Sequence, residues 1–156
     1  MPNNREKYQR LIGRAQAIKP AATAAVAHPC DEVSLRGAVE AAELGLLTPI
    51  LVGPRARISA VAAEFGLDIA GYELVDTAHS HASADIAVGL AREGKAEMLM
   101  KGSLHTDELM GAVVRSATGL RTERRISHAF VMDVPSLDQP IIITDAAINI
   151  FPTLED

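Results

Sequence analysis

The chain has 156 residues, the length of one ordinary domain, and carries a net charge of −5. Hydrophobic residues make up 48% and aromatic residues only 3%, so the core is built from Ala, Val, Leu and Ile, which favours an α/β class over a β-sandwich. The acidic balance implies no general attraction to nucleic acid or to an anionic membrane, and no apolar run approaches the ~18 residues of a transmembrane helix.

Helical and strand-like stretches alternate along the first 120 residues. Apolar spacing, capping residues and the positions of Pro and Gly predict helices over 5–18, from Asp31 or Ser34 to about Leu46, and over 54–66, 83–92 and 106–117. Short apolar runs predict strands over 22–29, 49–54, 72–76 and 96–102. This alternation implies parallel strands joined by right-handed crossovers, with helices on both faces of the sheet.

The pattern changes after Gly119, where two strand-like runs, 127–135 and 140–148, follow each other with a short polar connector. They predict a hairpin. We therefore expect a three-layer α/β/α fold with a mostly parallel sheet in a first domain over 1–120, and the beginning of a second domain, as a strand pair, over 121–156. Because a domain seldom stops directly after a strand and a loop, we expect the chain to be part of a longer protein.

The stretch "MLMKGSLHT" (98–106) places Lys101 and Gly102 at the end of a predicted strand, just before a helix that we expect Thr106 to cap. In parallel α/β sheets, ligands bind outside the carboxyl ends of the strands. Glycine admits a close backbone approach, and free N–H groups at a helix start favour an anion. The stretch thus predicts a phosphate site. Under the alternative, Asp107 and Glu108 merely complement the helix dipole and Lys101 is a solvated lysine.

Three further groups of residues suggest chemistry. "GLRTERRISH" (119–128) carries Arg121, Arg124 and Arg125, whose guanidinium forks match phosphate oxygens; the alternative is a solvated basic loop. In "TDAAINIFP" (144–152), Asp145 and Asn149 follow a strand. Asp145 could orient a ligand or accept a proton, and the Asn149 amide could donate a hydrogen bond to an oxyanion. The alternative is an Asx-type turn that closes the strand.

The segment "DTAHSHASAD" (76–85) carries two histidines, His79 and His81, between aspartates. A metal site would need further ligands, and none completes the set. We favour a helix N-terminus with polar caps and expect no metal. Cys30, the only cysteine, lies near His28, and we interpret it as a buried or incidental thiol. No internal disulfide is possible, which suits a cytoplasmic protein.

Taken together, "EAAELGLLTPILVGP" (40–54), "MLMKGSLHT" (98–106), "GLRTERRISH" (119–128) and "ITDAAINIFP" (143–152) resemble the phosphate acetyltransferase and phosphate butyryltransferase family, closest to its butyryltransferase-like branch. The resemblance covers nearly the whole chain. It implies the reaction acyl-CoA + phosphate ⇌ acyl phosphate + CoA in a homo-oligomer of two-domain α/β/α subunits. It implies no metal and no cofactor, because coenzyme A is a substrate. This branch includes modules fused behind an enoyl-CoA hydratase-like domain.

The resemblance further implies that this chain is the N-terminal half of such an enzyme, with its catalytic residues in the absent C-terminal half and little activity alone. Its substrate site is expected to include Lys101, Gly102, Ser103 and Thr106, with three residues lining the cleft: Arg121, Ser127 and Asn149. Two other classes stay open. One is a non-catalytic module that binds CoA or phosphate or supports assembly, and the other is a dehydrogenase of the isocitrate/isopropylmalate type, whose metal-binding aspartates are not evident.

Overall fold

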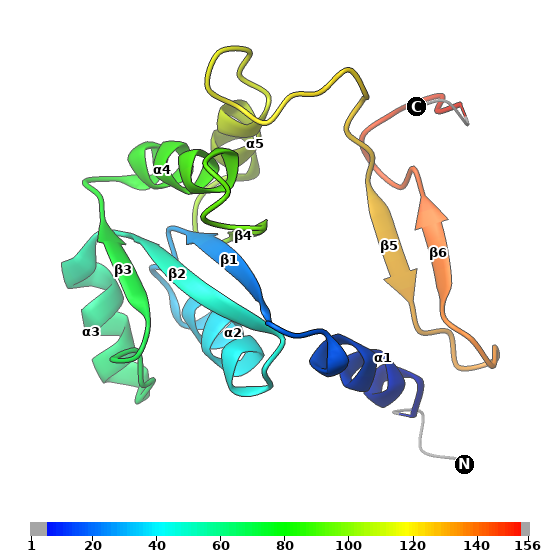
Figure 1. The fold of residues 1–156 in the computed structure, drawn as a ribbon, viewed down its shortest axis with the longest axis horizontal. Helices are drawn as coiled ribbons and strands as arrows, with labels where there is room; N and C mark the ends of the chain where they lie inside the picture. The colour runs from blue at the N-terminus through cyan, green and yellow to red at the C-terminus, as the bar shows by residue number, and fades with distance from the viewer. Residues whose placement is uncertain (1–5, 154–156) are drawn as a thin grey trace. The chain divides into compact units, whose positions relative to one another are not determined.

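A computed structural model describes residues 6–153 of the chain, which divide into two compact units (Figure 1). We call Ile18–Arg121 the sheet unit, and residues 6–17 with 122–153 the strand-pair unit. The elements in chain order are α1 (Glu6–Ala17), β1 (Ala22–Ala27), α2 (Glu32–Glu43), β2 (Leu47–Gly53), α3 (Arg55–Phe65), β3 (Glu73–Asp76), α4 (Ser80–Arg92), β4 (Met98–Lys101), α5 (Thr106–Val113), β5 (Ala129–Met132) and β6 (Ile141–Thr144).

The sheet unit contains four parallel strands in the order β3-β2-β1-β4. Helices α4 and α5 cover one face and α2 and α3 the other, as the predicted three-layer fold requires (Figure 1). Successive residues of β1 alternate between the layers, because Ala25 and Ala27 pack with α4 whereas Val26 packs against Leu35 of α2. The small side chains of Ala25 and Ala27 thus let α4 pack closely against β1.

The sequence-predicted helices and strands are present, with their ends shifted by a few residues. Asp31 caps α2 by accepting a hydrogen bond from the Ser34 N–H (2.9 Å), and Gly66 ends α3 in the left-handed conformation (φ 64°). Helix α4 begins at Ser80, three residues before the predicted start, because His79 caps it. Helix α5 ends at Val113, before the predicted Ala117. No helix among residues 6–153 is both long and apolar enough to cross a membrane.

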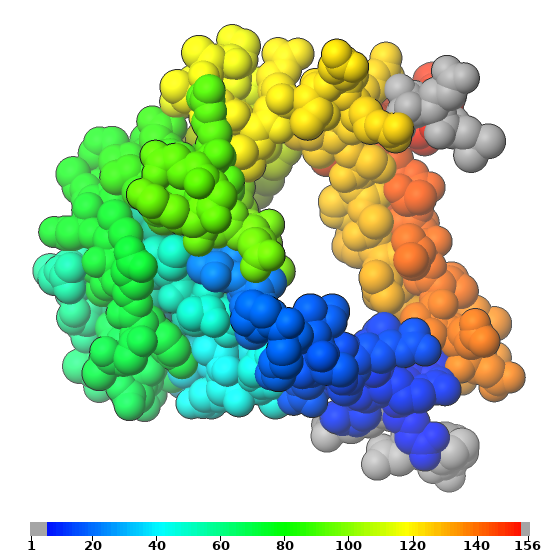
Figure 2. Space-filling model, in the orientation of Figure 1, coloured from blue at the N-terminus to red at the C-terminus, as the bar shows by residue number. Residues whose placement is uncertain are grey.

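The strand-pair unit joins α1 to the antiparallel hairpin of β5 and β6. Both strands are shorter than predicted, since β6 ends at Thr144, where Asp145 begins a turn. All eight strand residues are exposed, and atoms of both strands can be seen in Figure 2. The predicted domain boundary at residue 120 lies beside Arg121, the last residue of the sheet unit, but α1 groups with the hairpin.

Candidate functional site at the carboxyl edge of the sheet

The strand order creates a switch point between β1 and β4. From β1 the chain passes through α2 to β2 on one side, while β4 lies on the other side of β1. Loops leave the carboxyl ends of these two strands in opposite directions there, and such a crevice is the usual ligand position in open α/β sheets. The loops in question are 28–31 after β1 and 102–105 after β4.

Ser103 ties these two loops together. Its backbone N–H and its hydroxyl both donate to the His28 carbonyl oxygen (2.9 Å each), and its oxygen accepts from the Cys30 N–H (3.2 Å). The Ser103 hydroxyl is therefore occupied in holding the loops in register. Sequence reasoning assigned Ser103 to the substrate site, and the geometry gives it this structural role at the same edge.

Gly102 is buried beneath the end of β1. The reason why this position requires glycine differs from the predicted one. A Cβ at this position would lie 2.4 Å from the Ala27 carbonyl oxygen and 2.5 Å from that of His28. The Gly102 N–H also donates to the Ala27 carbonyl (2.8 Å). The missing side chain thus admits the neighbouring backbone, whereas the sequence analysis expected it to admit a ligand.

Lys101 is exposed at the end of β4. Its ammonium donates to the Gly102 carbonyl oxygen (3.3 Å). It also lies near Asp31, the cap of α2, whose pKa is lowered mainly by hydrogen bonds from Ser34 and to a smaller extent by this lysine. An ammonium group has three N–H donors, so Lys101 could contact an anion in front of the β1–β4 crevice in addition to the Gly102 carbonyl.

The start of α5 differs from the prediction in one respect. His105, not Thr106, is the capping residue, because the Glu108 carboxylate reaches back and accepts a hydrogen bond from the His105 N–H (2.7 Å). Thr106 is instead the first, exposed residue of the helix. Glu108 thus places an internal anion at this N-terminus, so an external phosphate finds fewer free donors there than the sequence suggested.

Glu108 also joins α5 to α4. The Ser80 hydroxyl donates to its carboxylate (2.5 Å), and His81 Nδ1 lies 2.8 Å from the same oxygen. The pKa of Glu108 is lowered by the bonds from Ser80 and His105. His79 caps α4 by accepting from the Ala82 N–H (3.2 Å), so the favoured interpretation of this segment as a capped helix start is confirmed. Among the described residues, no three His, Cys, Asp or Glu side chains are placed to hold a metal together.

A buried polar group that the sequence analysis missed lies behind this edge. His28 adopts a left-handed backbone conformation (φ 58°), is 4% exposed, and its Nδ1 lies 2.9 Å from the Ser83 hydroxyl. The Ser83 hydroxyl also lies 2.8 Å from the Thr77 hydroxyl and 3.0 Å from the His79 carbonyl oxygen, to which it can donate. Burial, and next the charge of Arg57, lowers the pKa of His28, which favours the neutral ring.

This group was missed because its members are far apart in the sequence. His28 and Ser83 are separated by 55 positions. The one local signal is Ser83 itself, a polar residue on the apolar face of α4. Such a residue needs a partner when buried.

The remaining predicted site residues divide between the two units. Arg121 is exposed at the end of the sheet unit. Ser127 and Asn149 belong to the strand-pair unit, where the Ser127 hydroxyl lies 3.1 Å from that of Thr144 and the Asn149 amide donates to the Ile126 carbonyl (3.0 Å). The structure brings Ser127 and Asn149 together at the end of β6, and Lys101, Gly102, Ser103 and Thr106 at the sheet edge.

Asp145 forms the Asx-type turn that was the alternative to a catalytic role. Its carboxylate accepts from the N–H groups of Ala147, Ile148 and Asn149 (3.1–3.2 Å) and from the Asn149 amide (2.5 Å). Burial raises the pKa of this carboxyl, but the hydrogen bonds outweigh it and lower the pKa to about 2. Asp145 therefore acts here as the charged centre of a turn.

Comparison with known proteins confirms the resemblance that the motifs suggested. The chain is 65% identical over 154 residues to a phosphate acetyltransferase of Rhizobium meliloti, which covers 99% of this chain and 48% of the relative. It is 53% identical to a phosphate acetyltransferase of Rickettsia felis, over 94% of this chain and 42% of the relative. A phosphate butyryltransferase of Clostridium beijerinckii is 34% identical, over 97% and 50% respectively. The chain spans about half the length of the curated relatives it matches, and no protein-family model matches it.

Solved structures show the same fold. A phosphotransacetylase from Streptococcus pyogenes superposes with a TM-score of 0.76 at 18% identity, covering 93% of this chain and 53% of that one. A branched-chain phosphotransacylase from Enterococcus faecalis superposes with a TM-score of 0.63 at 24% identity, covering 85% and 45%. These superpositions, which cover most of the chain, support its α/β fold.

Proposed function

We propose that the protein is a phosphate acyltransferase, which exchanges an acyl group between coenzyme A and inorganic phosphate. The observation that carries the proposal is the 65% identity to a phosphate acetyltransferase over 99% of the chain. Because the chain spans about half of that relative, we further propose that sequence outside this chain supplies the catalytic residues that remain unassigned here. The activity then belongs to a protein of the relatives' length.

The chemistry of the reaction explains why the β1–β4 edge suits it. A phosphate oxygen attacks the thioester carbonyl carbon, the carbonyl oxygen becomes an oxyanion, and the carbon–sulfur bond then breaks to release the thiolate of coenzyme A, which takes up a proton. Positive charge held in place before the reaction stabilises both anions. In this proposal Lys101 supplies that charge, while Gly102 and Ser103 fix the loop that carries it.

Other features of the proposal rest on the resemblance. The reaction requires neither a metal nor a redox cofactor, since coenzyme A enters as a substrate. A homo-oligomer in the cytoplasm would suit it, and the single, buried Cys30 is compatible with a reducing compartment. Arg121, Ser127 and Asn149 are proposed to face the substrates in the complete protein.

The test is phosphate-dependent release of coenzyme A, followed with a thiol reagent, for this chain and for a protein of the relatives' length that contains it. We expect turnover of acetyl-CoA or butyryl-CoA by the longer protein and little by the chain alone. A longer protein that binds coenzyme A but never releases it from acyl-CoA would favour the non-catalytic module instead. The observation that favours this alternative is the burial of Ser83 and His28, because a buried Ser–His pair is not accessible to a substrate as nucleophile and base.

A further inference from the structure

Helix α1 is fixed against the connector between β5 and β6 by one buried lysine. The Lys7 ammonium contacts the Asp133 carboxylate and the carbonyl oxygens of Val134 and Leu137, each at 2.7 Å. These three acceptors use all three of its N–H donors, and Lys7 is only 8% exposed. Its charge is therefore neutralised within the strand-pair unit and is not available to a ligand.

Arg10 and Arg14 lie one helical turn apart on α1, on the side that carries Lys7. Arg10 donates to the Asp138 carbonyl oxygen (3.3 Å), which leaves most of its donors unused. Within residues 6–153 neither guanidinium makes an ion pair. Residues four apart on a helix lie on the same face, so this face of α1 carries two positive charges.

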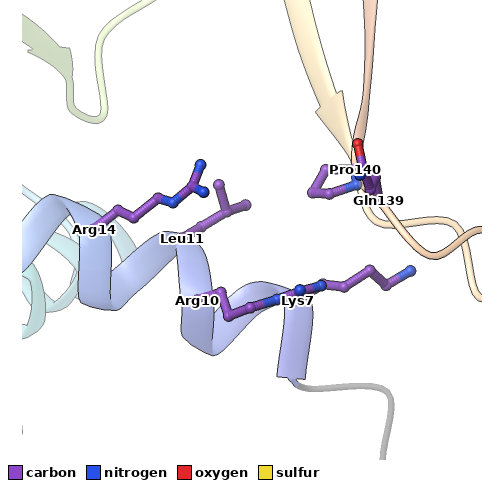
Figure 3. Close-up of a pocket in the computed structure, with 6 residues that line it drawn as sticks. All are labelled: Lys7, Arg10, Leu11, Arg14, Gln139 and Pro140. Atoms are coloured by element: carbon purple, nitrogen blue, oxygen red, sulfur yellow. The ribbon is translucent and has the colours of Figure 1, made fainter.

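A groove of about 190 Å³ opens between this helix face and the turn that leads into β6. Figure 3 shows the Leu11 and Arg14 side chains extending from α1 on the side of Pro140. Leu11 and Pro140 give the groove an apolar wall, and the arginines give it a cationic one. Its lining residues, all from the strand-pair unit, are Lys7, Arg10, Leu11, Arg14, Gln139 and Pro140.

We propose that this groove is a binding site for a phosphoanion, held between the guanidinium groups of Arg10 and Arg14. Guanidinium forks match phosphate oxygens in geometry and charge. The apolar wall would accept the organic part of a phosphate ester. The groove belongs to the strand-pair unit, whereas the proposed acyl transfer is assigned to the sheet unit, and the present proposal does not depend on that function.

The test is calorimetric titration of the chain, at low salt, with inorganic phosphate and with ADP. All proteins carry Lys101→Ala, so that phosphate bound at the sheet edge does not contribute. The groove variant is Arg10→Gln with Arg14→Gln. The matched control is Arg36→Gln with Lys95→Gln. These two cations of the sheet unit, the first half-buried and the second exposed, are already paired with Glu32 and Glu93, and the control changes the net charge equally.

We expect the groove variant to lose about ten-fold or more in affinity, because two charge-assisted contacts disappear, and the control to change less than about two-fold. Both arginines are exposed, so thermal unfolding should show that the groove variant remains folded. Tighter binding of ADP would identify a nucleotide-like ester as the ligand, and equal binding a simple phosphate. Absence of saturable binding to the parent, or equal losses in groove variant and control, would overturn the proposal.

Discussion

In the sheet unit, apolar side chains on both faces of the sheet are buried beneath helices, whereas the strand-pair unit exposes its apolar side chains and buries a charged one. The buried apolar residues run from Ala24 to Ala112, all within the sheet unit. Among the described residues of the strand-pair unit, Lys7 is the one that is buried, while Ile150 and Phe151 are 87% and 88% exposed. Apolar burial supplies most of the free energy of folding, and polar contacts mainly specify geometry. The two units should therefore respond differently to the same kind of change.

The largest difference is expected for a leucine and an isoleucine truncated to alanine. Leu51 in β2 is fully buried, so Leu51→Ala should lower the free energy of unfolding by about 2–5 kcal/mol. Ile142 in β6 is 69% exposed, so Ile142→Ala should change it by only about 0.5 kcal/mol. Urea denaturation of both variants provides the comparison, and similar costs would show that the strand pair has a core of its own.

A pair of glycines sharpens the account of the sheet edge. Gly102→Ala forces a methyl group against two carbonyl oxygens and should cost about 1–3 kcal/mol. Gly89, inside α4, has open space around the added carbon, so Gly89→Ala should stabilise the protein by about 0.5–1 kcal/mol. Should Gly102→Ala be neutral in thermal unfolding, the close backbone approach at β1 would be disproved.

A substitution of Lys7 tests whether its polar contacts hold α1 against the connector between β5 and β6. Lys7→Met leaves the Asp133 carboxylate and two carbonyl groups without their donor, a loss of about 1–3 kcal/mol that should be confined to this unit. Hydrogen exchange of the β5 and β6 amides should accelerate while that of β1 and β2 does not. Lys95→Met breaks an exposed pair with Glu93 and should leave hydrogen exchange unchanged in both units. Faster exchange throughout the sheet unit would contradict this division.

A smaller effect is expected at low pH, where protonation of Asp145 should lower the stability of its turn. The pKa of Asp145 is lowered from 3.8 to about 2, so its contribution to stability is complete above pH 4 and is lost as the pH falls through 2. An NMR titration of the carboxyl carbon should give a midpoint near pH 2. Asn149→Ala removes a side-chain donor and should move the midpoint upward. A midpoint near 4 in the parent protein would show that the turn does not form in solution.

Local sequence signals predicted the elements well and their long-range relations poorly. The strand–helix alternation, the Asp31 cap and the Gly66 terminus follow from residues near each other in the chain. The hairpin and its Asx turn were equally local. In contrast, the association of α1 with the hairpin depends on Lys7 and Val134, which are 127 residues apart. No local pattern indicates such a pairing.

The candidate site shows the same limit. Lys101 was placed correctly at a strand end because a short apolar run and a glycine mark it. The cap of α5 was misplaced at Thr106, since a Glu108 side chain that reaches back selects His105 instead. Local patterns did not reveal the buried His28–Ser83–Thr77 group, because it joins the loops after β1 and β3 to helix α4.

The central claim, that phosphate binds in front of the β1–β4 switch point, is tested most directly by the phosphate dependence of acyl transfer in a protein of the relatives' length. Lys101→Ala should reduce kcat/KM for phosphate by about ten-fold or more, because an exposed positive charge next to the reacting anion is lost. The matched Lys95→Ala variant should stay within about two-fold of the parent. Equal values for Lys101→Ala and the parent would contradict the account.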